Sequence, residues 1–232
     1  MPPTIDQWIA ARGPDAICAA LESMVTPERI ARIDLVLAAR LTSVVTIVED
    51  TYDPHNAVAT IRTTEAIGLQ ELHVIEPHEE TAFGVARGIT RGADDWIDIK
   101  RWRDPIAPMA ALRERGFKIY GTTPGGPHTI DDVDVTRPIA VAFGNEHAGL
   151  TPAALAACDE AIGIPMYGFT ESFNLSVTVA LAMSRIAARR RSAIGALGDL
   201  PDERRRELRA RWFAHKIRNA AGILERVLAD TP

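Results

Sequence analysis

Short, unbroken apolar runs recur along this chain, and they constrain its fold more than any other feature of the sequence. The two clearest are VVTIV at 44–48 and PIAVAF at 138–143. Such a run of apolar and β-branched residues is typical of a strand buried on both faces, which occurs mainly in parallel sheets. Further candidate strands lie at 72–75, 96–99, 118–121 and 161–165.

Helical patterns separate the candidate strands. The predicted helices lie at 4–24 (broken at Gly13-Pro14), 26–41, 57–67, 82–87, 105–115, 151–158, from Ser172 or Asn174 to about Arg191, and within 201–228. This alternation predicts an α/β fold, with a parallel sheet covered by helices on both faces. Ligands of such sheets bind at the carboxyl ends of the strands. The loops at 49–56, 121–127, 144–150 and 165–172 are therefore expected to gather at one edge.

The composition is that of a soluble globular protein, with 47% hydrophobic and 25% charged residues. No apolar run approaches the roughly 18 residues of a transmembrane helix. The first residues lack the layout of a signal peptide, so we expect a cytoplasmic protein. In that compartment the two cysteines, Cys18 and Cys158, are expected to be reduced thiols.

The net charge of −5 conceals an asymmetry along the chain. From Arg185 to Arg218 there are eleven basic and four acidic residues, a local net of +7, so the remainder sums to −12. The arginine runs at 189–191 and 204–206 are read as lacking acidic partners at helical spacing. This pattern favours a nucleic-acid surface, with a solvated, salt-bridged helix as the alternative.

Common catalytic motifs are absent. No G-x-G-x-x-G joins a first strand to a helix, and there is no Walker loop, no G-x-S-x-G and no zinc-like spacing of Cys and His, so no metal is expected. The polar residues that remain in the loops and adjoining helices are Asn56, Arg62, Glu146, Ser172 and Asn174. This set is poor in conventional bases. It suits chemistry in which an activated cofactor carries the reactive group and the protein positions it.

Three ordered segments give a specific resemblance. They are DTYDPHNAVATIRTTEAIGL at 50–69, AVAFGNEHAGLT at 140–151 and IPMYGFTESFNLSVTVALAM at 164–183. In sequence and order they resemble the three motifs of the SpoU branch of the SPOUT methyltransferases, and most of all the TrmH type. The likeness spans roughly residues 26–215. It implies an S-adenosylmethionine-dependent RNA ribose 2′-O-methyltransferase acting on guanosine 18 in the D-loop of tRNA. Alternatives are the same reaction on ribosomal RNA, or a non-catalytic RNA-binding protein.

The resemblance also implies an architecture. Residues 43–192 would form the SPOUT domain, whose C-terminal segment threads a loop to make a trefoil knot. Residues 1–42 would be an N-terminal helical extension, and 193–232 a basic C-terminal one. The protein would bind tRNA and form a homodimer, with each site completed across the interface.

Individual roles carry over from the family's motifs. The implied catalytic residues are Arg62, Asn56, Glu146, Ser172 and Asn174. Backbone groups at Thr122, Gly144, Ile164, Met166 and Phe173 would bind the cofactor. Glu146 would orient Arg62 or Asn56, and Ser172 and Asn174 would cap the last helix of the domain. The expected RNA contacts are the loop residue His55 and, from the basic charge of their run, Arg189, Arg190 and Arg191. One departure from the family pattern is Glu171, where Gln is usual.

Overall fold

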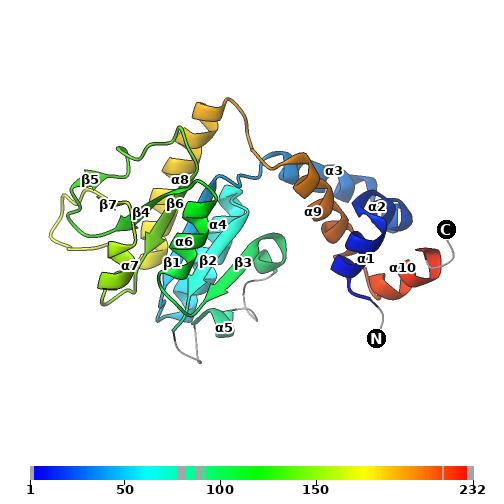
Figure 1. The fold of residues 1–232 in the computed structure, drawn as a ribbon, viewed down its shortest axis with the longest axis horizontal. Coiled ribbons are helices and arrows are strands. Elements are labelled where there is room, and N and C mark those ends of the chain that lie inside the picture. Colours follow the sequence, from blue (N-terminus) through cyan, green and yellow to red (C-terminus); the bar gives the residue numbers. More distant parts are fainter. Residues whose placement is uncertain (1–2, 78–81, 87–89, 91, 216, 229–232) are drawn as a thin grey trace. The chain divides into compact units, whose positions relative to one another are not determined.

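The chain divides into two compact units. The computed structural model describes residues 3–77, 82–86, 90, 92–215 and 217–228. One unit, here called the helical unit, combines residues 1–40 with 198–232, and the other, the sheet unit, spans 41–197. Both are drawn in Figure 1.

The described part of the sheet unit is built on seven parallel strands in the order β3-β2-β1-β6-β4-β7-β5. The strands are β1 (Val44–Glu49), β2 (Glu71–Ile75), β3 (Asp98–Trp102), β4 (Lys118–Thr122), β5 (His128–Thr129), β6 (Ile139–Phe143) and β7 (Glu160–Gly163). The two strongest apolar runs, β1 and β6, pair with each other, Val44 opposite Ile139. The predicted parallel α/β fold is therefore confirmed, while the trefoil knot stays a prediction.

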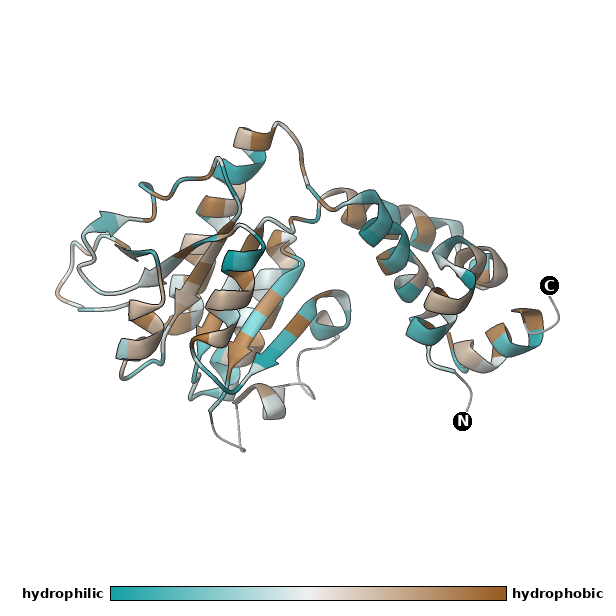
Figure 2. Cartoon of the chain, in the orientation of Figure 1, coloured by the Kyte–Doolittle hydropathy of each residue, from teal (hydrophilic) through white to brown (hydrophobic). Residues whose placement is uncertain are grey.

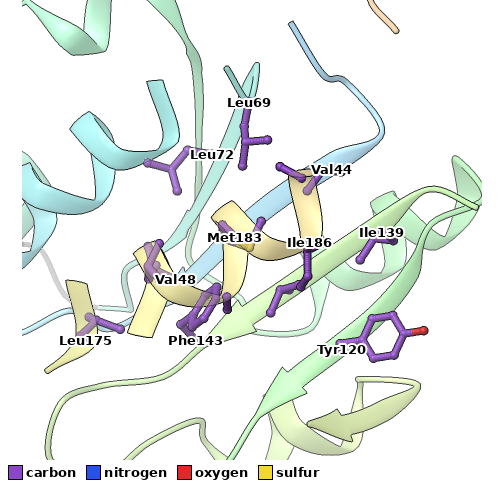
Figure 3. Close-up of a cluster of buried hydrophobic side chains, with 14 of the residues drawn as sticks. Val44, Val48, Leu69, Leu72, Tyr120, Ile139, Phe143, Leu175, Met183 and Ile186 are labelled. Carbon is purple, nitrogen blue, oxygen red and sulfur yellow. The ribbon is translucent and has the colours of Figure 1, made fainter. Parts of the chain in front are cut away.

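Helices cover both faces of this sheet. They are α4 (Pro54–Ile67), α5 (Ala82–Ala86), α6 (Ala107–Glu114), α7 (Pro152–Ala156) and α8 (Leu175–Ile194), with a 3₁₀ turn at Ala93–Trp96. Side chains of β1 alternate between two cores, as the pleat requires. Val44 and Val48 join the core under α4 and α8, whereas Val45 and Ile47 join the core under α6 and α7. Figure 3 shows Val44 and Val48 beside Met183 of α8.

The edge strands differ from the central ones. β3 and β5 are largely hydrophilic in Figure 2, whereas β1 and β6 are fully buried. β5 has only two residues and was not predicted, because so short a strand carries no periodic signal. The strand expected at 96–99 begins at Asp98, after the 3₁₀ turn. Arg87, the expected end of the helix at 82–87, lies outside the described residues.

Local chemistry explains where α4 begins. It starts at Pro54, three residues before the predicted Ala57, because the Asp53 side chain accepts the amide of His55 and Pro54 occupies the first turn. The prediction that 49–56 is wholly loop was therefore wrong at its end. Asn56 lies in the first turn of α4, where the helix fixes its direction.

The helical unit contains α1 (Ile5–Arg12), α2 (Pro14–Leu21), a 3₁₀ turn (Glu22–Met24), α3 (Pro27–Ala38), α9 (Asp202–Ala214) and α10 (Ala220–Leu228). The predicted break at Gly13-Pro14 is confirmed, and Gly13 adopts a φ of 79° there. Helix α9 packs against α2 and α3, and the buried Arg40 lies over the Trp212 ring at 5.3 Å. Within the described residues, no helix combines the length and apolarity needed to cross a membrane.

Candidate active site

A cleft opens where strands β4, β6 and β7 end and α8 begins. Its walls come from the chain at 122–124, 143–149, 163–166 and 171–178. All five residues expected at the cofactor line it: Thr122, Gly144, Ile164, Met166 and Phe173. Three of the four loops that the sequence placed at this edge thus meet around one cavity, and the fourth reaches it through hydrogen bonds described below.

Glycines let the backbone itself form the cleft wall. A Cβ atom on Gly144 would lie 1.9 Å from the carbonyl carbon of Gly149, so no other residue fits there. The amides of Asn145 and Gly149 bond to each other's carbonyl oxygens at 3.0 and 2.8 Å, closing a tight turn. Gly163 approaches a neighbouring loop less closely, and its Cβ would meet Thr123 O and Gly126 N at 3.1 Å, a tight contact.

Glu146 connects the cleft to the loop before α4. Its Oε2 accepts the amide of Tyr52 at 3.0 Å, and its Oε1 accepts the amide of Asp53 at 3.4 Å and Nδ2 of Asn56 at 2.7 Å. Burial opposes the charge of Glu146, but these donors outweigh it and lower its pKa. The carboxylate is therefore ionised and held in one orientation. Of the two partners expected for Glu146, the structure pairs it with Asn56.

A further hydrogen bond joins the same two loops. Nδ2 of Asn145 donates to the carbonyl of Asp50 at 2.5 Å, and Asp50 has a φ of 49°, in the left-handed region. Asp is one of the few residues that tolerate this conformation. At the end of β1, Glu49 is buried and accepts both the amide and the hydroxyl of Thr151, at 2.8 and 2.7 Å. Hydrogen bonds from Asn145, before Glu146, and from Thr151, after it, thus hold this segment against the loop at 49–56.

Asn174 and Ser172 have separate environments. Asn174 is the N-cap of α8, and its Oδ1 accepts the amide of Ser176 at 2.9 Å and the hydroxyl at 2.7 Å. Ser172 is exposed, lines the cleft and has no hydrogen-bond partner among the described residues. The expectation that both cap the helix holds for Asn174 alone. Ser172 instead belongs to the cleft wall.

Arg62 and His55 lie outside the lining of the cleft. Both are exposed on α4, on the side of the helix opposite Ala57 and Ile61, which are buried in the core. Asn56, one position after His55, is in contrast buried and bonded to Glu146. Arg62 forms no hydrogen bond or ion pair with any residue that the structure describes. No described residue therefore occupies its guanidinium, which can meet a ligand or a second chain.

The arginine run at 189–191 serves the fold of the sheet unit. Arg189 donates to the carbonyls of Ile130 and Val133 at 3.0 and 2.9 Å. Arg190 is buried and donates to the Ser43 hydroxyl and the Val135 carbonyl, each at 2.9 Å. Arg191 donates to the carbonyls of Leu197 and Ile67 at 2.7 and 2.8 Å. The predicted RNA contact at these residues stays a prediction, and the burial of Arg190 speaks against it there.

The second arginine run, at 204–206, is paired with acids. Arg204 bonds to Glu207 at 2.7 Å, Arg205 lies 3.3 Å from Asp202, and Arg206 lies 3.7 Å from Asp15. Further along α9, Arg209 and Arg211 bond to Asp34 and Asp6. The reading of this run as lacking acidic partners at helical spacing was wrong. Its pairs include two at that spacing and others with helices from the opposite end of the chain.

Sequence reasoning missed some cleft residues. Leu175 and Thr178, in the first turn of α8, line the cavity. Their spacing could have indicated them, because Thr178 is three residues after Leu175 and four after Asn174, and residues at these spacings share a helix face. The amide of Tyr52 bonds to Glu146, but a backbone donor leaves no signal in the side-chain pattern. Among the described residues, no group of three His, Cys, Asp or Glu could hold a metal ion.

Several known proteins are similar to this chain. The model of the SpoU rRNA Methylase family matches residues 43–184. The tRNA (guanosine(18)-2′-O)-methyltransferase of Borreliella burgdorferi is 33% identical over 202 residues, covering 86% of this chain and 90% of that protein. The protein of the same name from Thermus thermophilus is 35% identical over 160 residues, covering 68% and 81%. The crystal structure of the A. aeolicus TrmH/SpoU tRNA modifying enzyme superposes with a TM-score of 0.72 at 27% identity, covering 82% of this chain and 98% of that one.

Proposed function

Because the chain belongs to the SpoU rRNA Methylase family, we propose that it transfers the methyl group of S-adenosylmethionine to a ribose 2′-oxygen of tRNA. The proposed target is guanosine 18 in the D-loop, the nucleotide named for its relatives from Borreliella burgdorferi and Thermus thermophilus. One observation carries the proposal: five backbone positions expected at the cofactor line a single cleft beside the Glu146–Asn56 pair. We further propose a cytoplasmic location, where tRNA is found.

The cleft fits this cofactor in its chemistry. Ile164, Met166 and Phe173 supply apolar walls for an adenosine, and the glycine-lined backbone near Gly144 supplies peptide groups at close range. The ionised Glu146 adds a negative charge to the wall, which suits a cationic ligand. When bound, S-adenosylmethionine would supply a methyl group to a nucleophilic oxygen, with the positively charged sulfur leaving as a neutral thioether.

The residues of this chain hold the reacting oxygen in place. In-line displacement requires the ribose 2′-oxygen to be aligned with the methyl group and to lose its proton. Ser172, exposed on the cleft wall, is placed to hydrogen-bond the ribose. Glu146 holds Asn56, so that the first turn of α4 stays fixed against the cleft. Asn174 keeps the start of α8 in place by capping it.

Arg62 is proposed as the catalytic arginine. A guanidinium stays protonated at neutral pH, so its role is to bind the neighbouring phosphate through two N–H groups and stabilise the developing alkoxide. Because Arg62 lies outside the cleft lining of its own chain, we also propose a homodimer in which Arg62 serves the site of the partner. Its exposure supports this arrangement.

Methyl transfer tests the proposal directly. The protein is incubated with labelled S-adenosylmethionine and either total tRNA or ribosomal RNA, and the methylated nucleotide is then mapped. We expect label in the ribose of tRNA guanosine 18. Arg62→Ala should lower kcat about 100-fold or more without changing cofactor affinity. The matched control is Arg137→Ala, an exposed arginine outside the cleft lining. Label in ribosomal RNA alone, or no transfer and no cofactor binding by calorimetry, contradicts the proposal.

A further inference from the structure

Exposed aromatic rings belong to two loops beside the cleft. In one loop, Tyr167 and Phe169 are 96% and 108% exposed, the highest values among the large apolar side chains of the described residues. They lie in the loop that also supplies Met166 and Ser172 to the cleft wall. In a second loop, Tyr52 is 74% exposed, and its backbone amide bonds to Glu146, which lines the cleft. Two loops beside the cleft thus carry uncovered rings.

The arrangement of these rings suits planar partners. Gly168 separates Tyr167 from Phe169, and a Cβ atom on it would meet only the Thr170 hydroxyl, at 4.0 Å. Because Tyr167 and Phe169 are both almost fully exposed, neither ring covers the other, and the two do not merge into a packed apolar patch. Tyr52 lies edge-on to the His147 ring, with centroids 5.5 Å apart and planes at 70°. A protein interface is typically one continuous packed patch, whereas separated rings accept flat groups one at a time.

Charge around the cleft argues for contact by stacking. The sheet unit has 20 acidic and 14 basic residues, a net charge of −6. The loops beside the cleft add Asp50, Asp53 and Glu171 to the charge of Glu146. Attraction of phosphates is therefore weak here, and an RNA needs another source of affinity. Bases of single-stranded loops can stack on aromatic side chains, and the strength of this stacking depends little on charge or base sequence.

From these observations we propose that Tyr52, Tyr167 and Phe169 form a stacking frame for unpaired RNA bases next to the target ribose. The inference rests on the proposed function and deepens it, since it names how the same site holds its substrate. The rings hold neighbouring bases out of their helical stack, which turns the intervening ribose toward Ser172. They are substrate-positioning residues and take no part in the transfer itself.

Binding of an unmodified tRNA transcript, measured by fluorescence anisotropy, tests the frame. Tyr167→Ala and Phe169→Ala should each weaken the affinity about 5- to 150-fold, the range for losing one stacked base. Phe169→Leu, which keeps the apolar volume but removes the ring, should behave like Phe169→Ala, and Phe169→Trp should restore binding. The control is Ile106→Ala, an exposed apolar residue of the same unit outside the cleft lining.

Two further measurements separate stacking from other roles. The slope of log affinity against log salt should be unchanged in the ring variants, because no phosphate contact is lost. The KM for tRNA should rise while that for S-adenosylmethionine stays constant. Wild-type affinity in Phe169→Leu overturns the frame, as does a ring variant that converts a dimer to a monomer in sedimentation. If wild-type protein methylates tRNA but the ring variants bind it normally, the frame alone fails. If wild-type protein neither binds nor methylates RNA, the proposed function falls with it.

Discussion

Two carboxylates of the sheet unit, Glu146 and Glu71, are held in opposite ways. Glu71, at the start of β2, accepts bonds from Lys100 at 3.0 Å and from Arg115 at 2.9 and 2.7 Å, with His73 at 3.2 Å. Glu146, beyond the end of β6, accepts from two backbone amides and the side-chain amide of Asn56. Positively charged side chains balance the negative charge of Glu71, whereas, among the described residues, only neutral donors surround the negative charge of Glu146.

The kind of donor, charged at Glu71 and neutral at Glu146, distinguishes a structural cluster from a candidate site. Burial alone would raise the pKa of Glu71, but the bonds from His73, Arg115 and Lys100 hold it far below its usual value. The pKa of Glu146 is also lowered, and there the amide donors that bond to it are neutral. A dense group of charges thus fastens β2 to its neighbours. An ionised carboxylate held by neutral donors beside a cleft leaves its field available to a ligand.

Glu146→Gln should have the larger effect on activity. The amide places its own N–H₂ group against donors and removes the negative charge from the cleft wall, so kcat should fall about 100-fold. The free energy of unfolding should change by less than about 1 kcal/mol, since the side chain is only half-buried. Single-turnover methylation and thermal unfolding measure the two quantities. Glu114→Gln, an exposed control on α6, should change neither. Unchanged turnover in Glu146→Gln would remove the distinction between the two carboxylates.

Glu71→Ala should affect stability and leave activity intact. Its loss unpairs His73 inside the protein, whereas Lys100 and Arg115, with side chains 45% and 39% exposed, can return to water. We expect a loss of about 2 kcal/mol, which lowers Tm by roughly 4–8 °C for a protein of this size. Turnover per folded molecule at 25 °C should equal that of the wild type. A variant with normal Tm but reduced turnover would place Glu71 in the site instead.

The smallest expected effect is a pH dependence of stability, which arises at His73, the partner of Glu71. Burial, which outweighs the bond to Glu71, lowers the pKa of His73 below its unfolded value of about 6.5. The unfolded state then binds the proton more readily, so stability is full above about pH 6.5 and declines as pH falls below it. The loss is at most about 1.4 kcal/mol for each pH unit in this window.

Thermal unfolding between pH 7.5 and 5.5 measures the contribution of His73. His73→Gln should flatten the dependence of Tm on pH, and His128→Gln, at an exposed position, should leave it unchanged. Equal slopes in His73→Gln and wild-type protein would show that His73 does not contribute. Cofactor affinity should be independent of either substitution, because neither residue lines the cleft.

Much of the fold could be predicted from the sequence because its signals are local. The apolar runs of β1 and β6 mark buried strands, and Asn174 before an apolar helix marks the start of α8. The same holds for the loops of the cleft, since each directly follows a predicted strand. The predicted start of an element was wrong where a single side chain decides it, as Asp53 does for α4.

The roles of the arginines could not be predicted, because their partners lie far away in sequence. Arg209 and Arg211 bond to Asp34 and Asp6, which helical spacing cannot reveal. Arg190 is likewise bonded to Ser43 and to the carbonyl of Val135. A run of basic residues therefore indicates charge density, but only the packed structure decides whether the charge is available to a polyanion.

The pairing of β1 with β6 has a consequence for how the protein acquires its fold. Val44 and Ile139 meet at the centre of the sheet although most of the sheet unit separates them in sequence. Long-range parallel pairing of this kind folds slowly, since a large loop must close before any contact rewards it. The cleft also needs the first turn of α8, the last helix of the unit. A cofactor can therefore bind only the completed fold. During refolding, S-adenosylmethionine should bind only the native state and so shift the equilibrium from late intermediates toward it.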